Sequence, residues 1–327
     1  MTFWGVRQYY CAVALLVGAS AAAQQIADPD FDASVERPAY TTNGPTIAID
    51  QAHWNFHTMT TGYQPFAELL RNDGYAVQPA TQTFAAEMLA GIDILVISNA
   101  GVMNRASPGA PAFTEQECDA VRDWVRDGGS LLLIADHAPA GAAAEILGQR
   151  FGVAMGKGWV FDRSETQGEI TTQLVFSRDN GLLGEHPLLH GRSAADEVRH
   201  LRSFTGQSLG VPEGATVLMR LSATARETPT VSDLDAIEEA MAANTAAARR
   251  TVDALSTPVT GRAQGIAMAF GEGKVVVLGE AAMLSAQIAR FEQDGQQREI
   301  RAGMNVPGTD DRQFALNVLH WLSGALQ

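Results

Sequence analysis

The stretch Leu131-Leu-Leu-Ile-Ala-Asp136-His137 joins a run of aliphatic side chains directly to an acid and a histidine. Two further runs also end on an acid: Thr46-Ile-Ala-Ile-Asp50 and Val275-Val-Val-Leu-Gly-Glu280. Short aliphatic runs of this kind are typical of strands that are buried on both faces of a parallel sheet. In open α/β sheets, ligands bind beyond the carboxyl ends of the strands, so we expect these polar residues on the edge where a site would form.

Strand and helix patterns alternate on both sides of this stretch. The helix at 113–126 has the clearest boundaries, because Thr114 and Glu117 can form a capping box and Gly128-Gly129 ends it. The other elements expected in the first half are strands at 46–50, 75–79, 92–98 and 130–135, and helices at 63–73 and 138–151. This alternation favours a doubly wound α/β sheet.

The second half adds an antiparallel portion. We expect a hairpin at 265–270 and 274–278, and a last helix at 309–322 capped by Thr309 or Asp310. One Ala-rich inserted helix is expected across about 232–255. Strand-like segments lie at 169–176, 198–204 and 216–221. We therefore expect one α/β domain over 46–327, with a mostly parallel sheet and an added antiparallel part.

The N-terminal residues have the layout of an export signal. Residues 1–23 contain Arg7, an apolar core at 11–18 and small residues at 19–23, which are the three parts of a secretory signal peptide. That core is too short to span a bilayer. Residues 24–45 are polar and contain three prolines, so we expect an extended leader or linker there. The mature protein is expected in the periplasm or outside the cell, without a membrane span.

Composition excludes one class of partner. The formal net charge of the 327-residue chain is −14, and an acidic protein of this size repels nucleic acid. Once residues 1–23 are removed, Cys118 is the only cysteine, and we expect it to pack within a helix. His320, between Leu319 and Trp321, is likewise expected in the core.

Several motifs together resemble the class I glutamine amidotransferase-like superfamily. They are WVRDGGSLLLIADH at 124–137, His186-Pro187, GKVVVLGE at 273–280 and RQFALNVLHWL at 312–322. The resemblance extends over 46–322 and is nearest to a branch shared with gliding-motility and intraflagellar-transport auxiliary domains. The resemblance implies a flavodoxin-like sheet. Because the related auxiliary domains look like binding parts of larger assemblies, it also implies that this chain could have such a role.

One residue separates the chain from true amidotransferases. Those enzymes carry a nucleophilic cysteine on the turn after the strand that matches 131–135, and Asp136 occupies that place here. A carboxylate cannot replace the thiolate that attacks a glutamine amide. The sequence also has no G-x-S-x-G elbow and no P-loop. We therefore do not expect glutamine amidotransferase activity.

The acids and histidines after the strands are the candidate site. Imidazoles and carboxylates together are ligands for zinc or a similar divalent metal, whose bound water can act as a nucleophile. Asp50-x-x-His53 and Asp136-His137 are expected on neighbouring strand ends. The proposed metal ligands are Asp50, His53, His57, Asp136 and His137. The proposed catalytic residues are Asp136, His137 and Glu280, with Glu280 as a further ligand or general base.

Three interpretations of these residues stay open. They can hold a metal, act as metal-free acids and bases, or serve only structure, as Asp136 would if it capped the helix from Ala138. The first functional hypothesis is an exported hydrolase of a small or saccharide-like substrate. The alternative is a non-catalytic module that binds a small ligand or a protein partner.

Overall fold

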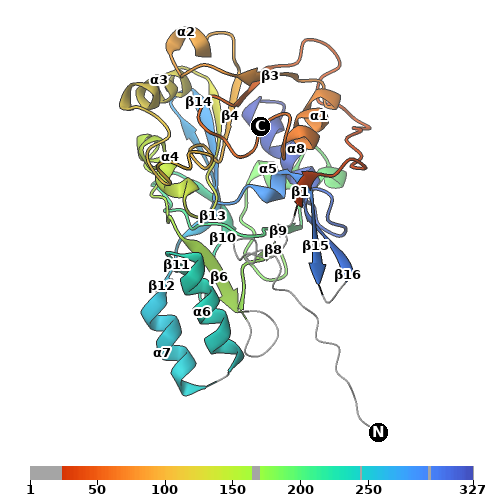
Figure 1. Cartoon of the computed structure of the whole chain (residues 1–327). Coiled ribbons are helices and arrows are strands. Elements are labelled where there is room, and N and C mark those ends of the chain that lie inside the picture. The colour runs from red at the N-terminus through yellow and green to blue at the C-terminus, as the bar shows by residue number, and fades with distance from the viewer. Residues whose placement is uncertain (1–23, 164–169, 244, 294–295, 327) are drawn as a thin grey trace.

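The computed structural model describes residues 24–163, 170–243, 245–293 and 296–326, so the predicted signal peptide lies outside the described residues (Figure 1). Its centre is a seven-stranded sheet. The strands are β2 (Thr46–Asp50), β3 (Ala76–Ala80), β4 (Ile94–Ser98), β5 (Ser130–Ile134), β10 (Thr216–Arg220), β13 (Ala263–Phe270) and β14 (Gly273–Leu278). They lie in the order β10-β13-β14-β5-β4-β2-β3.

The sheet is doubly wound, as the sequence predicts. Strands β14, β5, β4, β2 and β3 run parallel to one another, whereas β13 is antiparallel to both of its neighbours, β14 and β10. From β2 the chain first adds β3 on one side and then crosses back to add β4 on the other. The strand order therefore reverses between β2 and β4, which makes the carboxyl ends of these two strands the topological switch point.

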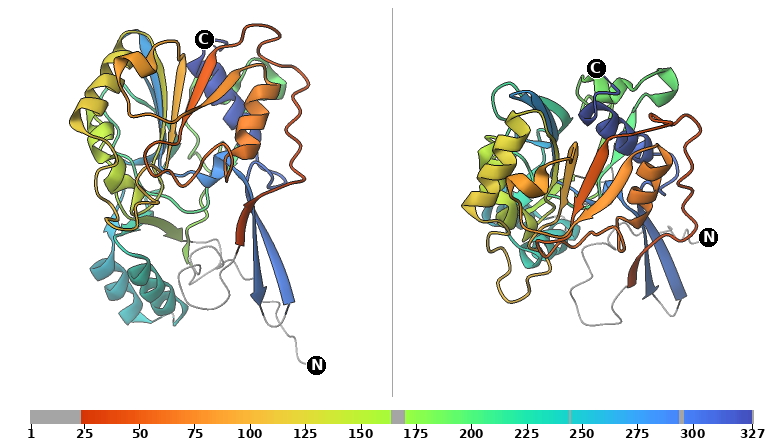
Figure 2. Two further views of the ribbon diagram at one scale, coloured as in Figure 1. Left: turned by 45° about the horizontal axis from the view of Figure 1, so that its top comes forward. Right: turned by 90° about the horizontal axis from the view of Figure 1, so that it is seen from above.

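The inner strands are buried on both faces because helices cover both sides of the sheet (Figure 2). In β4, Ile94 and Val96 join one core cluster, whereas Leu95 and Ile97 join the other. The first cluster includes side chains of α1 (Gln64–Asn72), α5 (Pro187–His190) and α8 (Asp311–Leu322). The second includes side chains of α2 (Ala86–Leu89), α3 (Glu115–Arg126) and α4 (Ala140–Arg150).

Smaller antiparallel sheets extend the domain. Four strands lie in the order β12-β11-β6-β7, two form β8-β9, and three form β1-β15-β16. The predicted strand at 169–176 is wrong as one element, because β7 and β8 belong to different sheets, and residue 169 lies outside the described residues. The bounds are β6 (Trp159–Arg163), β7 (Ile170–Thr171), β8 (Val175–Ser177), β9 (His200–Arg202), β11 (Arg226–Thr228), β12 (Thr257–Pro258), β15 (Ala286–Gln293) and β16 (Gln296–Gly303).

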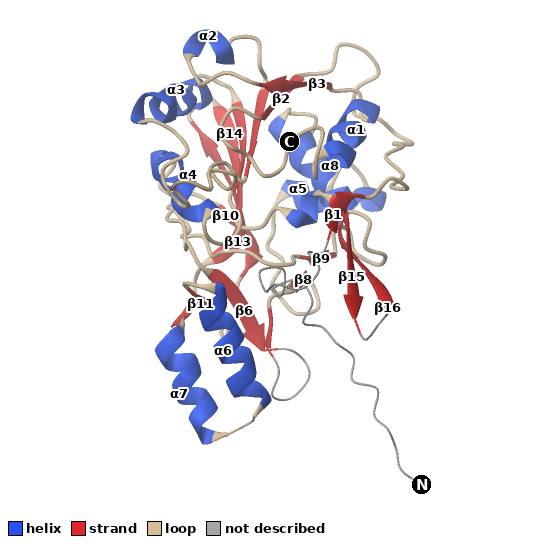
Figure 3. Cartoon of the chain, in the orientation of Figure 1, coloured by secondary structure: helices blue, strands red, loops and turns tan. Residues whose placement is uncertain are grey.

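The single helix predicted across 232–255 is two helices, α6 (Val231–Ala242) and α7 (Ala246–Leu255). Each begins at a threonine whose side chain accepts a backbone N–H, Thr230 from Asp233 and Thr245 from Ala248. An internal N-cap of this kind starts a new helix. The two helices form a hairpin that projects from the end of the molecule (Figure 3).

The segment at 24–45 is in part more ordered than the expected leader. Its first residues form β1 (Gln24–Ala27), which pairs antiparallel with β15. Phe31, Val35 and Tyr40 pack against the first core cluster. Within the described ranges, no helix is long and apolar enough to cross a membrane.

A buried hydrogen bond joins the first and last helices of the central domain. The Nε2 atom of His320 in α8 lies 2.6 Å from Oδ2 of Asp73, the residue that follows α1, and both side chains are fully buried. The other carboxylate oxygen of Asp73 accepts the N–H of Ala39 at 2.7 Å. His320 is therefore a core residue, as predicted, but its role depends on a polar partner 247 residues away.

We expect Asp73→Ala to lower the free energy of unfolding by about 3 kcal/mol, because it leaves a buried imidazole nitrogen without its partner. Arg290→Ala is the matched control, since it removes an exposed ion pair with Glu299 and should cost at most about 1 kcal/mol. Urea unfolding of both variants measures the difference. Equal costs would contradict a structural role for the Asp73–His320 bond.

Candidate functional site

The predicted site residues follow three strands of the central sheet at its carboxyl edge. Asp50 is the last residue of β2, Asp136 lies two residues after β5, and Glu280 lies two residues after β14. The expected neighbouring positions of β2 and β5 are wrong, because β4 lies between them. The residues therefore fall into one group after β2 and another after β5 and β14. Tyr63 links the two groups, because its ring stacks on His57 and its hydroxyl donates to the carbonyl oxygen of Ala281.

In the first group, His53 lies between two carboxylates. Its Nδ1 is 2.8 Å from Oδ1 of Asp50, and its Nε2 is 2.9 Å from Oε1 of Glu117. Burial lowers the pKa of His53, but the hydrogen bonds and charges of Asp50 and Glu117 outweigh burial and raise it overall. Both ring nitrogens are occupied, so His53 offers no lone pair to a metal.

Glu117 is a site residue that the sequence indicated only as part of a helix cap. The predicted capping box is confirmed: Thr114 accepts the N–H of Glu117, and Glu117 accepts the N–H of Thr114. The second oxygen of the same carboxylate bonds to His53. One side chain therefore both starts α3 and fixes the loop after β2. The packing of Cys118 in this helix is also confirmed, since the thiol is buried.

His57 is buried in an apolar environment. Its ring stacks on Tyr63 with centroids 4.6 Å apart and an angle of 10° between the planes. Burial lowers the pKa of His57 to about 3, so the ring is neutral at ordinary pH. A Cβ at Gly62 would lie 2.4 Å from Nδ1, so the glycine is what allows the close approach of the backbone. His57 packs as a core residue.

The geometry gives no support to a metal site at the five predicted ligands. Among the residues that the structure describes, no three His, Cys, Asp or Glu side chains are placed to hold a metal ion. Asp50 also accepts the Nδ2–H of Asn55 at 3.0 Å and the N–H of Ala52 at 3.1 Å. The carboxylate oxygens of Asp50 therefore bond to groups of the loop that follows β2.

In the second group, Asp136 and Glu280 interact electrostatically. Glu280 is fully buried, and its two oxygens accept the N–H groups of Ala282 and Met283, each at 2.8 Å. Burial, and then the charge of Asp136, raise the pKa of Glu280 well above its usual value. Burial also raises the pKa of Asp136, although neighbouring His137 opposes this. The two carboxyl groups therefore retain a proton above the pH at which an exposed acid would lose it.

Asp136 does not cap the following helix. Residue Pro139 precedes the first turn of α4, and no side chain caps that helix. Instead, the carboxylate of Asp136 accepts the N–H of His137 at 2.7 Å, and the N–H of Asp136 donates to Oδ1 of Asn99 at 2.9 Å. The residue is only partly buried, so it can meet a ligand at the edge of the sheet.

His137 is held in one orientation, and its Nε2 has no hydrogen-bond partner among the described residues. Its ring stacks on Trp159 with centroids 3.5 Å apart and 16° between the planes. Its Nδ1 lies 2.8 Å from the carbonyl oxygen of Ala138, so this nitrogen must carry the proton that is donated. In the neutral ring, Nε2 is therefore left with a lone pair.

Further buried polar groups lie near Glu280, and no sequence pattern marked them as site residues. The side-chain amide of Gln264 has no hydrogen-bond partner among the described residues. A Cβ at Gly206 would lie 2.5 Å from Nε2 of Gln264 and 3.0 Å from Cβ of Glu280, so the three residues are in close contact. Gln264 was missed because nothing local distinguishes it from other strand residues.

The side-chain N-cap predicted for the last helix, from Thr309 or Asp310, is not formed. Helix α8 follows Asp310 but has no side-chain cap. The carboxylate of Asp310 accepts the N–H groups of Arg199 and His200, and that of Asp311 accepts the N–H of Arg202. The charge of Asp311 adds to the rise in the pKa of Glu280. Asp311 therefore belongs to the same group of buried acids.

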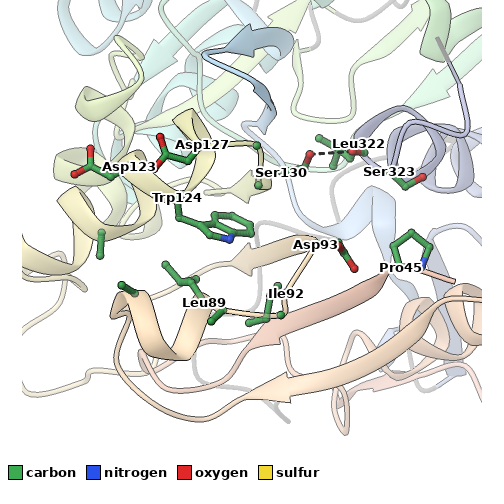
Figure 4. Close-up of a pocket in the computed structure, with 16 residues that line it drawn as sticks. Pro45, Leu89, Ile92, Asp93, Asp123, Trp124, Asp127, Ser130, Leu322 and Ser323 are labelled. Atoms are coloured by element: carbon green, nitrogen blue, oxygen red, sulfur yellow. Dashed lines mark hydrogen bonds between the residues drawn. The ribbon is translucent and has the colours of Figure 1, made fainter. Parts of the chain in front are cut away.

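A cavity of about 710 Å³ lies at the opposite, amino edge of the sheet (Figure 4). Trp124, Asp93 and Ser130 are among the residues that line it. Ser130 donates to the carbonyl oxygen of Leu322 at 2.8 Å, and Asp93 accepts the N–H of Thr46 at 2.7 Å. None of the predicted site residues lines this cavity.

Comparison with known proteins supports the fold only. No protein family and no curated protein matches the chain. The mmIFT52 N-terminal domain is similar over 85% of this chain and 97% of its own, with 13% identity and a TM-score of 0.53. A GMP synthase-like protein from Thermoplasma acidophilum covers 86% and 94% of the two chains, with 11% identity and a TM-score of 0.38.

A third structure, the exo-beta-1,4-mannosidase Op5Man5 from Opitutaceae bacterium strain TAV5, covers 72% of this chain and 31% of its own. Its sequence identity is 12% and its TM-score 0.35. At these identities the comparisons carry no activity across to this chain. The similarity to the mmIFT52 domain shows a related α/β fold, which agrees with the fold class expected from the sequence.

The buried acids make stability depend on pH. Burial raises the pKa of Asp311 from 3.8 to about 8, so the native state holds a proton that the unfolded chain releases between these values. The free energy of unfolding should therefore fall as pH rises through this window. We expect Asp311→Asn to reduce that slope and to be most stabilising above pH 8, where the wild-type acid must ionise while buried. Urea unfolding at several pH values measures it, and identical slopes for both proteins would contradict the burial of this acid.

Proposed function

We propose that the chain is a hydrolase of a small or saccharide-like substrate, and that Asp136 and His137 are its acid and base. The observation that carries the proposal is the pairing of an acid whose pKa is raised with an adjacent imidazole that has a free Nε2 lone pair. A proton donor and a proton acceptor at the same edge of the sheet are what acid–base catalysis requires. Both residues are partly exposed at the carboxyl edge of the sheet.

The reaction needs only these two groups and water. Nε2 of His137 accepts a proton from a water molecule while the water oxygen bonds to the electrophilic carbon of the substrate. The bond from that carbon to the leaving oxygen breaks, and Asp136 in its acid form donates a proton to the leaving oxygen. The imidazolium then returns its proton through solvent, and Asp136 regains one. The result is the addition of one water molecule across the broken bond.

Glu280 acts through Asp136 and not on the substrate. It was predicted as a metal ligand or general base, but its side chain is fully buried and both its oxygens accept backbone N–H groups. The charge of Asp136 adds to the rise in the pKa of Glu280, so the pair disfavours two negative charges at this edge. We therefore assign Glu280 as a positioning residue.

A non-catalytic ligand-binding or assembly module is the second candidate. The specific observation in its favour concerns Asp50 and Glu280, two of the three acids after the strands. Their carboxyl oxygens already accept hydrogen bonds from nearby groups of the protein. Membership of the amidotransferase-like superfamily, where the auxiliary domains serve as binding parts, stays part of this proposal. In this case the carboxyl edge would bind a ligand without cleaving it.

Asp136→Asn and His137→Ala are each expected to lower kcat by about 10²-fold or more, because each removes one proton-transfer group. Hydrolysis of panels of nitrophenyl esters and glycosides measures the effect. Activity should fall as pH rises through the pKa of Asp136, and Asp136→Asn should remove this alkaline limb. His190→Ala, a change at an exposed histidine, is the control. Full activity of Asp136→Asn would contradict the mechanism, whereas ligand binding without turnover would favour the second candidate.

We also propose that the protein is exported and acts in the periplasm or outside the cell. The support is the signal-peptide pattern of residues 1–23. Intact-mass analysis of the protein from a periplasmic or culture-medium fraction should show a chain that begins at Gln24. A cytoplasmic protein that retains residues 1–23 would contradict this.

A further inference from the structure

Three large apolar side chains are exposed near the candidate site. Among the described residues, the large hydrophobic side chains with high exposure are Trp54 at 64%, Phe56 at 39% and Met103 at 39%. Trp54 and Phe56 belong to the loop after β2, and Met103 belongs to the loop after β4. All three therefore lie in loops at the topological switch point of the sheet, where open α/β folds bind ligands.

Backbone hydrogen bonds hold these two loops side by side. The N–H of Gly101 donates to the carbonyl oxygen of His53 at 2.7 Å, and the N–H of Met103 donates to that of Trp54 at 2.9 Å. The N–H of Phe56 donates to the carbonyl oxygen of Asn99 at 3.2 Å. The three exposed side chains therefore belong to two loops that backbone hydrogen bonds hold together.

The conformation of Trp54 is one that a bulky residue rarely adopts. Its φ is +54°, in the left-handed region that favours glycine. Its ring is mostly exposed, so the strain is not offset by burial of the indole. Strain of this kind persists where the surrounding structure enforces it, and it is concentrated at functional sites. The loop therefore holds an exposed indole in a backbone conformation that costs the folded state free energy.

Asn99 connects this surface to Asp136. Its backbone carbonyl accepts the N–H of Phe56, and its side-chain oxygen accepts the N–H of Asp136 at 2.9 Å. Asn99 itself has a φ of +48°, so its backbone turns sharply at the end of β4. Asn99 therefore joins the loop that carries the apolar side chains to the segment that carries the partly exposed Asp136.

We propose that Trp54, Phe56 and Met103 form a stacking surface for a sugar ring of a neutral saccharide substrate. This inference rests on the proposed hydrolase function and names the substrate class of the same site. A sugar ring has an apolar C–H face that lies flat on an indole and hydroxyl groups that need polar partners nearby. The net charge of −14 disfavours anionic saccharides, which is why the substrate is neutral.

The test is binding of neutral hexasaccharides, namely cellohexaose, maltohexaose, mannohexaose and chitohexaose, to the full mature chain. Titration calorimetry is done in the Asp136→Asn background to prevent turnover. We expect one of the four to bind, Trp54→Ala to weaken its binding about tenfold, and Trp54→Phe to weaken it less. Trp124→Phe, at the opposite edge of the sheet, is the control and should leave the binding unchanged.

A second variant separates binding from stability. Trp54→Gly removes the ring and suits the positive φ, so we expect its Tm to be equal to or above that of the parent protein while its saccharide binding is weakened as in Trp54→Ala. Loss of binding with an unchanged Tm supports the stacking surface. Equal binding by the parent, Trp54→Ala and Trp54→Gly overturns it, and so does the absence of binding to all four saccharides.

The outcomes also distinguish this inference from the proposed function. Binding that depends on Trp54, without hydrolysis by the wild type, would uphold the stacking surface and refute the hydrolase. Hydrolysis that depends on Asp136, with an unchanged KM in Trp54→Ala, would uphold the hydrolase and refute the stacking surface. Sedimentation that shows self-association through Trp54, without saccharide binding, would identify the three side chains as a contact between copies and overturn the proposal.

Discussion

The burial of the inner strands on both faces is the constraint on which the rest of the structure depends. Strands β4 and β5 contain no exposed residue, because helices α1 and α8 cover one face of the sheet and α3 and α4 the other. Strands of this kind have no side on which a polar group can meet water. The acids and histidines are therefore excluded from the strands and collect at the ends, where loops leave the sheet.

The polar residues at the carboxyl edge of the sheet fall into two groups, one that fixes a loop and one to which we assign the proposed chemistry. His53 bonds to Asp50 through one ring nitrogen and to Glu117 through the other. These hydrogen bonds fix the loop after β2 and leave no ring nitrogen of His53 free. Asp136 and His137 are only partly buried, and they are the acid and the base of the proposed mechanism. The first group holds in place the loop that carries Trp54, so these buried residues also shape the proposed stacking surface.

Much of the fold was predictable, because its signals are local. The capping box of Thr114 and Glu117, the hairpin around Gly271 and the aliphatic strands each depend on residues close together in the sequence. The division of 232–255 into two helices was missed, although Thr245 is an ordinary N-cap residue, because the apolar stripe continues past it. The order of β2, β4 and β5 decided which candidate residues could meet, and strand order depends on long-range packing.

The sequence by itself determined that acids and histidines would gather at the carboxyl ends of a doubly wound sheet, since strand direction and burial follow from the pattern of side chains. Only the tertiary structure decided which of them bond to one another and which stay partly exposed. Glu117 reaches His53 across 64 residues, His320 reaches Asp73 across 247, and Trp54 takes a left-handed conformation because the loop after β4 bonds to its carbonyl. A hydrogen bond between distant segments depends on where the fold places both partners, and no local pattern carries that information.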